Sequence, residues 1–323
     1  MTTVDAGVDA RDFALEVEAD ARAATGAPGP RRHAWRRRGL GALKYAVLGL
    51  GAIVMLLPFA DMFVGALRGP ADVYANPPRY FPQDPQWGVY ARVFDELPMW
   101  RWMANSVIVT CTITLIQLVT SAMAGYALAR YEFPGRGSVF RLVVGAQMFP
   151  FFLLIIPTFF ILRFAPLVGG NDIAGQGGSG LLGTYAALVL PFAVTWYGVF
   201  LMRQFFTTIP EELIEAARLD GASEWLIFRR IALPLVKPAL ATLGVFAFVY
   251  HWNEFIWTMT ITRSAPELQT LPVGIYLLEN QFNDLDQKSL QQAALAVSVL
   301  PVLVLFVLAQ RLFVAANLES AVK

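Results

Sequence analysis

Residues 103–128 read MANSVIVTCTITLIQLVTSAMAGYAL and contain no charged side chain. The run is longer than the roughly 20 residues that cross the hydrocarbon core of a bilayer. A helix is the form that satisfies all backbone hydrogen bonds of such a segment internally. The whole chain of 323 residues is 56% hydrophobic and 15% charged, whereas soluble domains carry about 25% charged residues. The sequence therefore predicts an all-α integral membrane protein.

Five other apolar runs have a similar length, and they lie at about residues 43–67, 139–162, 181–202, 238–261 and 290–314. With the first run they predict six transmembrane helices within a membrane domain over residues 43–315. Shorter tails remain at residues 1–42 and 316–323, and the first tail favours a weak helix over residues 11–24. Six spans place both ends of the chain on the same side of the membrane.

Basic residues gather on one side of the membrane if the six spans alternate. They are Arg31, Arg32, Arg36, Arg37, Arg38, Lys44, Arg130, Arg136, Arg141, Arg203, Arg218, Arg229, Arg230 and Lys237. Cytoplasmic loops carry such an excess, so both termini are expected in the cytoplasm, with the chain in the cell membrane. The first run is long enough to span, which favours an uncleaved helix over a signal peptide.

Composition argues against several classes of protein. A net charge of +1 provides no basic face for nucleic acid. Cys111 is the only cysteine and cannot form an intrachain disulfide, and His33 and His251 lack neighbours at ligand spacing, so no metal site is expected. The sequence contains no Gly-x-x-x-x-Gly-Lys motif and no catalytic set of side chains, which predicts that the chain is not an enzyme and carries no cofactor.

The segment between the fourth and fifth spans, residues 203–237, is strongly patterned. Thr208 and Glu211 fit a capping box that starts a helix, and Gly221 fits a left-handed stop. A second helix is expected from Ser223 to Ile231, ending before Pro234. Small residues in the first helix would let another protein approach closely, so docking into a cleft is one interpretation. An amphipathic helix lying on the membrane surface is the alternative.

Within this segment, a spaced pattern resembles the EAA signature of permease subunits of binding-protein-dependent ABC importers. It consists of Glu215, Ala216, Ala217, Asp220 and Gly221, followed after nine residues by Ile231, Leu233 and Pro234. The resemblance implies that this loop is a coupling helix seated in an ATPase subunit. It also implies that Glu215 pairs with a basic group there and that Gly221 forms the turn between two short helices.

Further motifs, from Val47 to the C-terminus, resemble the maltose/multiple-sugar permease branch, and most closely its smaller, six-span partner. They are Asn105-Ser106, Gln147-Met148-x-Pro150, Trp252-Asn253-Glu254-Phe255-x-Trp257, Thr270-Leu271-Pro272-Val273-Gly274, Gln310-Arg311 and Ala321-Val322-Lys323. The resemblance implies a MetI-like ABC permease fold and transport of a sugar or related polar solute. Implied partners are a second homologous permease, two ATPase subunits that bind ATP-Mg, and an extracytoplasmic solute-binding protein.

Two features depart from the family pattern. Ala316 and Ser320 stand where glycines are usual near the C-terminus, which argues against the family's tail contact with the ATPase in this chain. The glycine-rich stretch at residues 169–183 is longer than in the simplest members, and its composition predicts a flexible connector or a rim that meets a partner.

The fifth apolar run carries the candidate residues for a translocation path or gate: His251, Asn253, Glu254, Trp257 and Thr258. On a continuous helix, His251, Glu254 and Thr258 share one face. A charge at the centre of a span costs about 2.5–3.5 kcal/mol, so it calls for a reason. The stripe either lines the solute path or ties its span to neighbouring helices through hydrogen bonds, and the pattern leaves both open. Pro150, Pro157 and Pro191 are expected to kink their spans.

A second function class is a secondary transporter that works alone. That class predicts an internal repeat and ionisable residues at the midplane. We find no convincing repeat in the sequence. His251 and Glu254 are an ionisable pair in a span that could relay protons, but two groups make a weak case for ion coupling. The permease subunit is therefore the favoured interpretation.

Overall fold

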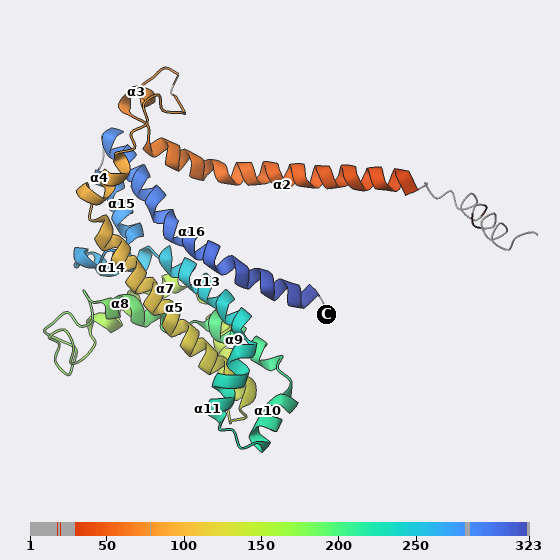
Figure 1. Ribbon diagram of the computed structural model, residues 1–323. Coiled ribbons are helices and arrows are strands. Elements are labelled where there is room, and N and C mark those ends of the chain that lie inside the picture. The colour runs from red at the N-terminus through yellow and green to blue at the C-terminus, as the bar shows by residue number, and fades with distance from the viewer. Residues whose placement is uncertain (1–17, 19, 21–29, 78, 282–284, 322–323) are drawn as a thin grey trace, which may run out of the picture. The chain divides into compact units, whose positions relative to one another are not determined.

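The computed structural model describes residues 18, 20, 30–77, 79–281 and 285–321. Every regular element in these ranges is helical, which confirms the all-α class for the described part of the chain (Figure 1). The chain divides into two compact units, Met1–Asp61 and Met62–Lys323. Most of the predicted N-terminal helix at residues 11–24, together with Val322 and Lys323, lies outside the described residues.

The first unit contains most of helix α2, which runs from Pro30 to Ala66. The helix begins before the predicted span, so the arginine-rich stretch continues directly into the apolar run. Side chains at residues 43–61 are exposed, including Met55 at 77%. Their apolar surface is left for lipid or another protein to cover.

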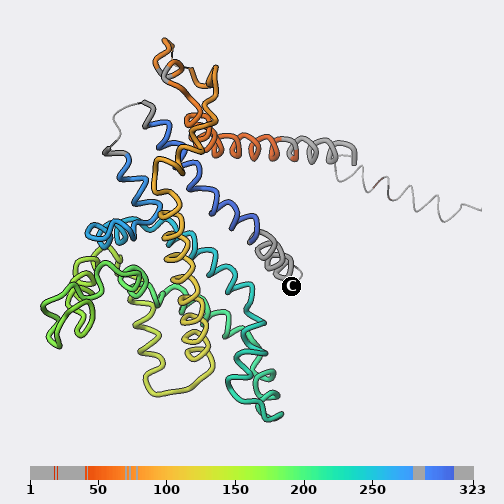
Figure 2. The backbone as a smooth tube through the Cα atoms, turned by 60° about the vertical axis from the view of Figure 1, so that its left-hand side comes forward, coloured from red at the N-terminus to blue at the C-terminus, as the bar shows by residue number. Residues whose placement is uncertain are grey.

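Helix α5, from Met99 to Arg130, is the central element of the second unit. It packs against α9 (Trp196–Thr207), α13 (Lys237–Trp252), α15 (Leu271–Gln281) and α8 (Tyr185–Val189). Figure 2 shows α5 and α13 running side by side. The remaining elements are α3 (Pro70–Val73), α4 (Val89–Glu96), α6 (Arg136–Ala146), α7 (Phe151–Arg163), η1 (Leu190–Phe192), α10 (Glu211–Leu219), α11 (Glu224–Ile227), η2 (Phe228–Ala232), α12 (Leu233–Leu235), α14 (Ile256–Thr262), η3 (Pro266–Leu268) and α16 (Leu285–Ala321).

Successive apolar clusters follow α5 along its length. Met99 and Trp102 belong to a cluster with α4, α15 and α16. Val109 and Ile113 pack with α8, η1 and α14. Tyr126, near the end of α5, packs with α9, α13 and the segment that joins them. One helix therefore supports the core at both ends of the unit.

Small residues set the close approach of α5 and α9. A Cβ atom on Gly125 would lie 2.6 Å from Cβ of Met202 and 2.8 Å from the backbone nitrogen of Arg203. A Cβ atom on Gly198 would likewise overlap the Ser121 hydroxyl. Membrane helices associate by such packing of small residues, because lipid provides no hydrophobic force between them.

Three helices are long and apolar enough to cross a membrane alone: Leu43–Ala66, Met99–Arg130 and Lys288–Leu308. The number rises to as many as six, by length and composition, if each of three bent pairs counts as one span. The bends are 106° for α6 and α7, 44° for α8–η1 and α9, and 76° for Glu224–Leu235 and α13. Pro150 lies at the sharpest break and Pro191 lies within η1, as expected for residues that interrupt helices. Pro157 lies inside α7.

The fifth span differs from its prediction. A single helix over residues 238–261 is wrong, because α13 ends at Trp252 and α14 begins at Ile256. The Glu254 carboxylate accepts hydrogen bonds from the backbone nitrogens of Trp257, at 2.7 Å, and Thr258, at 3.0 Å. A carboxylate on the first free amides starts a new helix instead of continuing the old one.

The glycine-rich stretch at residues 169–183, predicted to be a flexible connector or a rim, forms a loop with several internal hydrogen bonds. The Asn171 side chain is buried, donates to the carbonyls of Arg163 and Ala165, and accepts from the Gly178 amide. Asp172 accepts from the amides of Ala174 and Gln176, each at 2.8 Å. The glycines supply positive φ angles that the tight path requires, such as +81° at Gly170.

Gly125→Ala tests the α5–α9 contact. We expect it to lower the stability of the protein by about 1–3 kcal/mol, the usual cost of overpacking, measured as thermal unfolding in detergent. Gly137→Ala is the matched control, since Gly137 also lies in a helix and a Cβ atom added to it would have nothing within 4 Å. Equal melting temperatures for the two variants would contradict the proposed contact.

Candidate functional site

The segment from α10 to α12 ends its first helix with a Schellman motif. Gly221 has φ of +79°. Its amide donates to the Arg218 carbonyl, and the Ala222 amide donates to the Ala217 carbonyl, both at 3.0 Å. These are the two bonds that define the motif. The predicted left-handed stop at Gly221 is confirmed.

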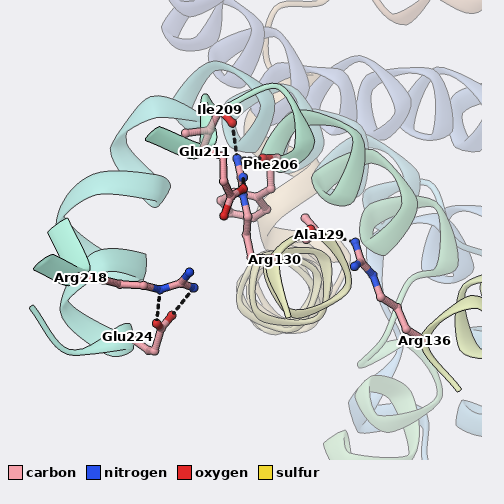
Figure 3. A network of polar contacts seen from close by, with 8 residues as sticks. All are labelled: Ala129, Arg130, Arg136, Phe206, Ile209, Glu211, Arg218 and Glu224. Atoms are coloured by element: carbon pink, nitrogen blue, oxygen red, sulfur yellow. Dashed lines mark hydrogen bonds and ion pairs between the residues drawn. The ribbon is translucent and has the colours of Figure 1, made fainter. Parts of the chain in front are cut away.

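The predicted capping box at Thr208 and Glu211 is wrong. Pro210 is the N-cap of α10 and makes no side-chain cap, while the Thr208 hydroxyl donates backwards to the Phe205 carbonyl at 2.8 Å. Glu211 instead forms an ion pair with Arg130, which comes from the end of α5 (Figure 3). A charged guanidinium is a stronger partner for the carboxylate than a backbone amide.

The second helix of the segment begins as predicted and ends later. Ser223 is its N-cap and accepts from the Leu226 amide at 3.4 Å. The helix continues through the π-helical turn η2 into α12, so the prediction that it ends before Pro234 is wrong. Local π-helical adjustment is a known way to accommodate proline within a helix in membrane proteins.

The segment buries one face and exposes the other. Ile214, Ile227, Phe228 and Ala232 are buried against residues of α5, α9 and α13. On the free side, Leu219 is 88% exposed and Trp225 is 60% exposed. The segment is therefore attached to the helical core and presents an apolar tip with acidic neighbours.

The structure divides the predicted coupling residues between these two faces. Exposed members are Glu215, Ala216, Asp220, Gly221 and Pro234. Ala217, Ile231 and Leu233 are half-buried and pack against the apolar cluster at the end of α5. The first group is available to another protein, whereas the second attaches the segment to its own chain.

An exposed ion pair closes the turn between α10 and α11. Arg218 Nε lies 2.7 Å from Glu224 Oε1, and this hydrogen bond lowers the pKa of Glu224. The pair therefore contributes its stability above the ordinary carboxyl range and loses it as pH falls through the lowered pKa. Its contribution is small, since both side chains are well exposed.

The predicted path residues do not share one face, because the helix breaks between them. His251 is buried, and its Nε2 lies 3.0 Å from Nε2 of Gln117, which also donates to the Phe192 carbonyl at 2.8 Å. With the Gln117 amide donating, His251 accepts at Nε2 and carries its proton on Nδ1. Nδ1 is buried without a hydrogen-bond partner among the described residues.

The other predicted path residues surround the break at residues 253–255. Glu254 accepts from the Thr258 hydroxyl at 2.7 Å in addition to the two amides. Trp257 is fully buried and its indole donates to the Ala187 carbonyl at 3.0 Å. Asn253 is exposed and donates to the Val249 carbonyl. Within this chain, Glu254, Trp257 and Thr258 form interhelical or capping contacts, and Asn253 is the member with a free surface.

Two of the sequence motifs bind one another. Asn105 donates to the carbonyls of Glu267 and Gln269 and accepts from the Tyr185 hydroxyl at 2.6 Å. Ser106 accepts from the Leu271 amide at 2.8 Å. These contacts fix the start of α15 on α5 and explain why polar residues stand there in the sequence.

Sequence reasoning missed Arg130 and Gln117 as organising residues. Arg130 looked like one of many basic residues at the end of a span, and nothing in its local sequence separates it from them. Gln117 carried a signal, since its amide stands inside an apolar run and therefore needs a partner. Its partners come from distant segments, which no local pattern identifies.

The chain matches one protein family and is similar to several transport-system permeases. Residues 117–317 match the family model described as the binding-protein-dependent transport system inner membrane component. The arabinooligosaccharides transport system permease protein AraQ of Halalkalibacterium halodurans is 32% identical over 84% of this chain and 92% of that protein. The sn-glycerol-3-phosphate transport system permease protein UgpE of Yersinia pestis is 30% identical, over 88% of this chain and 98% of that protein.

The chain also resembles a further permease and two solved structures. The diacetylchitobiose uptake system permease protein NgcG of Streptomyces coelicolor is 29% identical over 85% of this chain and 86% of that protein. A chain in the crystal structure of a bacterial ABC transporter involved in the import of the acidic polysaccharide alginate matches with a TM-score of 0.73 and 25% identity, over 85% of this chain and 96% of that chain. A chain from the alginate transporter in complex with alginate pentasaccharide-bound periplasmic protein has a TM-score of 0.58 and 17% identity, over 85% and 95% respectively, and so shows the fold alone.

Glu254→Ala and Glu254→Gln separate the capping role of Glu254 from a role that needs its charge. We expect Glu254→Ala to lower the stability by about 0.5–2 kcal/mol, the cost of losing a helix cap, measured as thermal unfolding in detergent. Glu254→Gln keeps one acceptor oxygen, so it should lose less. If the glutamine and alanine variants have the same melting temperature, the charge of Glu254 stabilises the protein and its hydrogen bonds to the helix amides do not.

Proposed function

Because the chain belongs to the family of inner membrane components of binding-protein-dependent transport systems, we propose that it carries a sugar or related polar solute across the membrane. The family match confirms the resemblance to ABC importer permeases. The solute class is supported by the relatives, whose names refer to arabinooligosaccharides, diacetylchitobiose and sn-glycerol-3-phosphate. The chain provides one permease subunit, and a second homologous permease completes the pathway.

The remaining partners follow from the same family. An extracytoplasmic solute-binding protein delivers the solute, which the description of the family as binding-protein-dependent supports. Two separate ATPase subunits bind ATP-Mg and drive transport, so the chain itself needs no nucleotide site and is not an enzyme. Lipid surrounds the apolar spans.

The segment from α10 to α12 is the contact for an ATPase subunit. The observation that carries this proposal is its division into two faces, with Glu215, Ala216 and the tip at Leu219 free while Ile214 is fully buried in the helical core. Glu215 pairs with a basic group of the ATPase, and Gly221 provides the turn. A movement of the ATPase against the free face would displace the segment, and with it the helices that pack on its buried face.

The orientation of the chain follows from this contact. An ATPase works in the cytoplasm, so the α10–α12 segment faces the cytoplasm and both termini lie on that side. The folded loop at residues 169–183 and the segment before α4 then face outward, toward the solute-binding protein. The excess of basic residues beside α10–α12 supports the same orientation.

Reconstitution tests the function. The chain, its second permease, the ATPases and the binding protein are placed in liposomes, and uptake of radiolabelled arabino-oligosaccharide, diacetylchitobiose and sn-glycerol-3-phosphate is measured. We expect uptake of a polar solute that requires both ATP and the binding protein. Uptake by the purified chain alone would instead indicate a secondary transporter.

Glu215→Ala tests the docking face. Loss of a hydrogen bond to a charged group is expected to weaken ATPase association by about 1.5–3 kcal/mol, measured by co-purification at graded ATPase concentration. Glu132→Ala is the matched control, an exposed glutamate that follows α5 and is not part of the α10–α12 segment. If the Glu215 variant binds the ATPase as tightly as the parent chain does, Glu215 is not part of the contact.

A further inference from the structure

Three arginines near the end of α5 donate hydrogen bonds to backbone carbonyls. Arg136 donates to the Leu128 and Ala129 carbonyls, each at 2.9 Å, and Arg203 donates to Leu128 at 3.3 Å. These two satisfy the free carbonyls in the last turn of α5, where cations are also favoured by the helix dipole. Arg130, the last residue of α5, points away to other elements (Figure 3).

Arg130 holds the junction between α9 and α10. Its Nη2 donates to the Phe206 carbonyl at 2.7 Å and also to the Ile209 carbonyl. Its Nη1 pairs with the carboxylate of Glu211, in the first turn of α10. One guanidinium therefore binds the end of one helix, the connecting turn and the start of the next.

The Arg130 contact is built into the interior. Its side chain is only 5% exposed, and the carbonyls that it binds belong to the buried residues Phe206 and Ile209. Lysine could not replace it, because a guanidinium presents five donors in a planar fork and an ammonium is a single point. The ion pair between Arg218 and Glu224 differs, since it joins two parts of the same segment and both of its side chains are well exposed.

We propose that Arg130 is a positioning residue that locks α10 to the end of α5, so that the two helices move as one body when the ATPase moves α10. This inference rests on the proposed function for the role of α10, and it adds the connection by which that movement enters the transmembrane core. Two helices held together by apolar contacts alone can slide past one another by small steps. The directional contacts of Arg130 instead fix the position of α10 relative to α5.

The distance between α10 and α5 tests the proposal. Spin labels are placed on cysteines at Met123 and Glu212, both exposed, in a Cys111→Ser background, and pulsed electron paramagnetic resonance gives the distance distribution. The complex is measured without nucleotide and with ATP and vanadate. With Arg130 present we expect a narrow distribution that is the same in both states.

Arg130→Lys is expected to broaden the distribution and to shift its mean when ATP and vanadate are added, because α10 then follows the ATPase without α5. Arg136→Lys is the matched control, since it removes contacts at the same helix end and leaves the α9–α10 junction untouched. Its distribution should stay narrow and unshifted. A narrow, unshifted distribution for Arg130→Lys overturns the proposal, and so does equal broadening by Arg136→Lys.

A second variant covers the case in which Arg130→Lys does not fold. Glu211→Gln removes the ion pair and leaves the bonds from Arg130 to the two carbonyls. It should broaden the distance distribution and shift its mean in the same direction as Arg130→Lys does. An unchanged distribution would overturn the proposal. Failure of the proposed function is seen separately, because the parent chain would then not co-purify with ATPase subunits, while the nucleotide-free distances would still report whether Arg130 locks α10.

Discussion

Within the hydrocarbon core a backbone carbonyl or amide has no water to bind, and an unsatisfied group costs several kcal/mol. The bent pairs interrupt their helices and so create such groups. Polar side chains of α5, a single helix from Met99 to Arg130, bind two carbonyls at one of these breaks. Gln117 and Thr120 bind the carbonyls of Phe192 and Ala193, where α8–η1 gives way to α9. Arg130 does the same at the junction before α10. The break between α8–η1 and α9 and the junction before α10 therefore both take hydrogen-bond partners from α5.

The sequence predicted the features that depend on local composition. The all-α class, the stretch of residues 103–128, the turn at Gly221 and the start of the second loop helix at Ser223 are each encoded within a few neighbouring residues. Its errors share another cause. Thr208 and Glu211 fit a capping box locally, but Glu211 is paired with Arg130 from 81 positions earlier in the chain. The run over residues 238–261 looked continuous because apolar periodicity does not register that Glu254 caps a new helix.

The predicted site was affected in the same way. The spacing of His251, Glu254 and Thr258 fits one helical face only while the helix continues, and the break at residues 253–255 separates them. What the spacing identified is a set of polar residues that must be satisfied, and the structure assigns most of them partners inside this chain. The EAA-like pattern behaved differently, because Glu215, Ala216, Asp220 and Gly221 stand on a free surface. In the proposed importer, these exposed residues are the ones that contact the ATPase.

One aromatic layer surrounds the predicted path residues His251 and Trp257. Phe192 lies 4.9 Å from His251 and 4.8 Å from Phe151, as ring centroid distances, and Phe151 lies 5.9 Å from Trp257. Phe151 follows the break before α7, Phe192 precedes the break before α9, and Trp257 follows the break before α14. Gln117 of α5 binds the same layer through Phe192 and His251. In the proposed importer, a movement that enters α5 at Arg130 therefore reaches three hinged spans together, at the level where their helices are already interrupted.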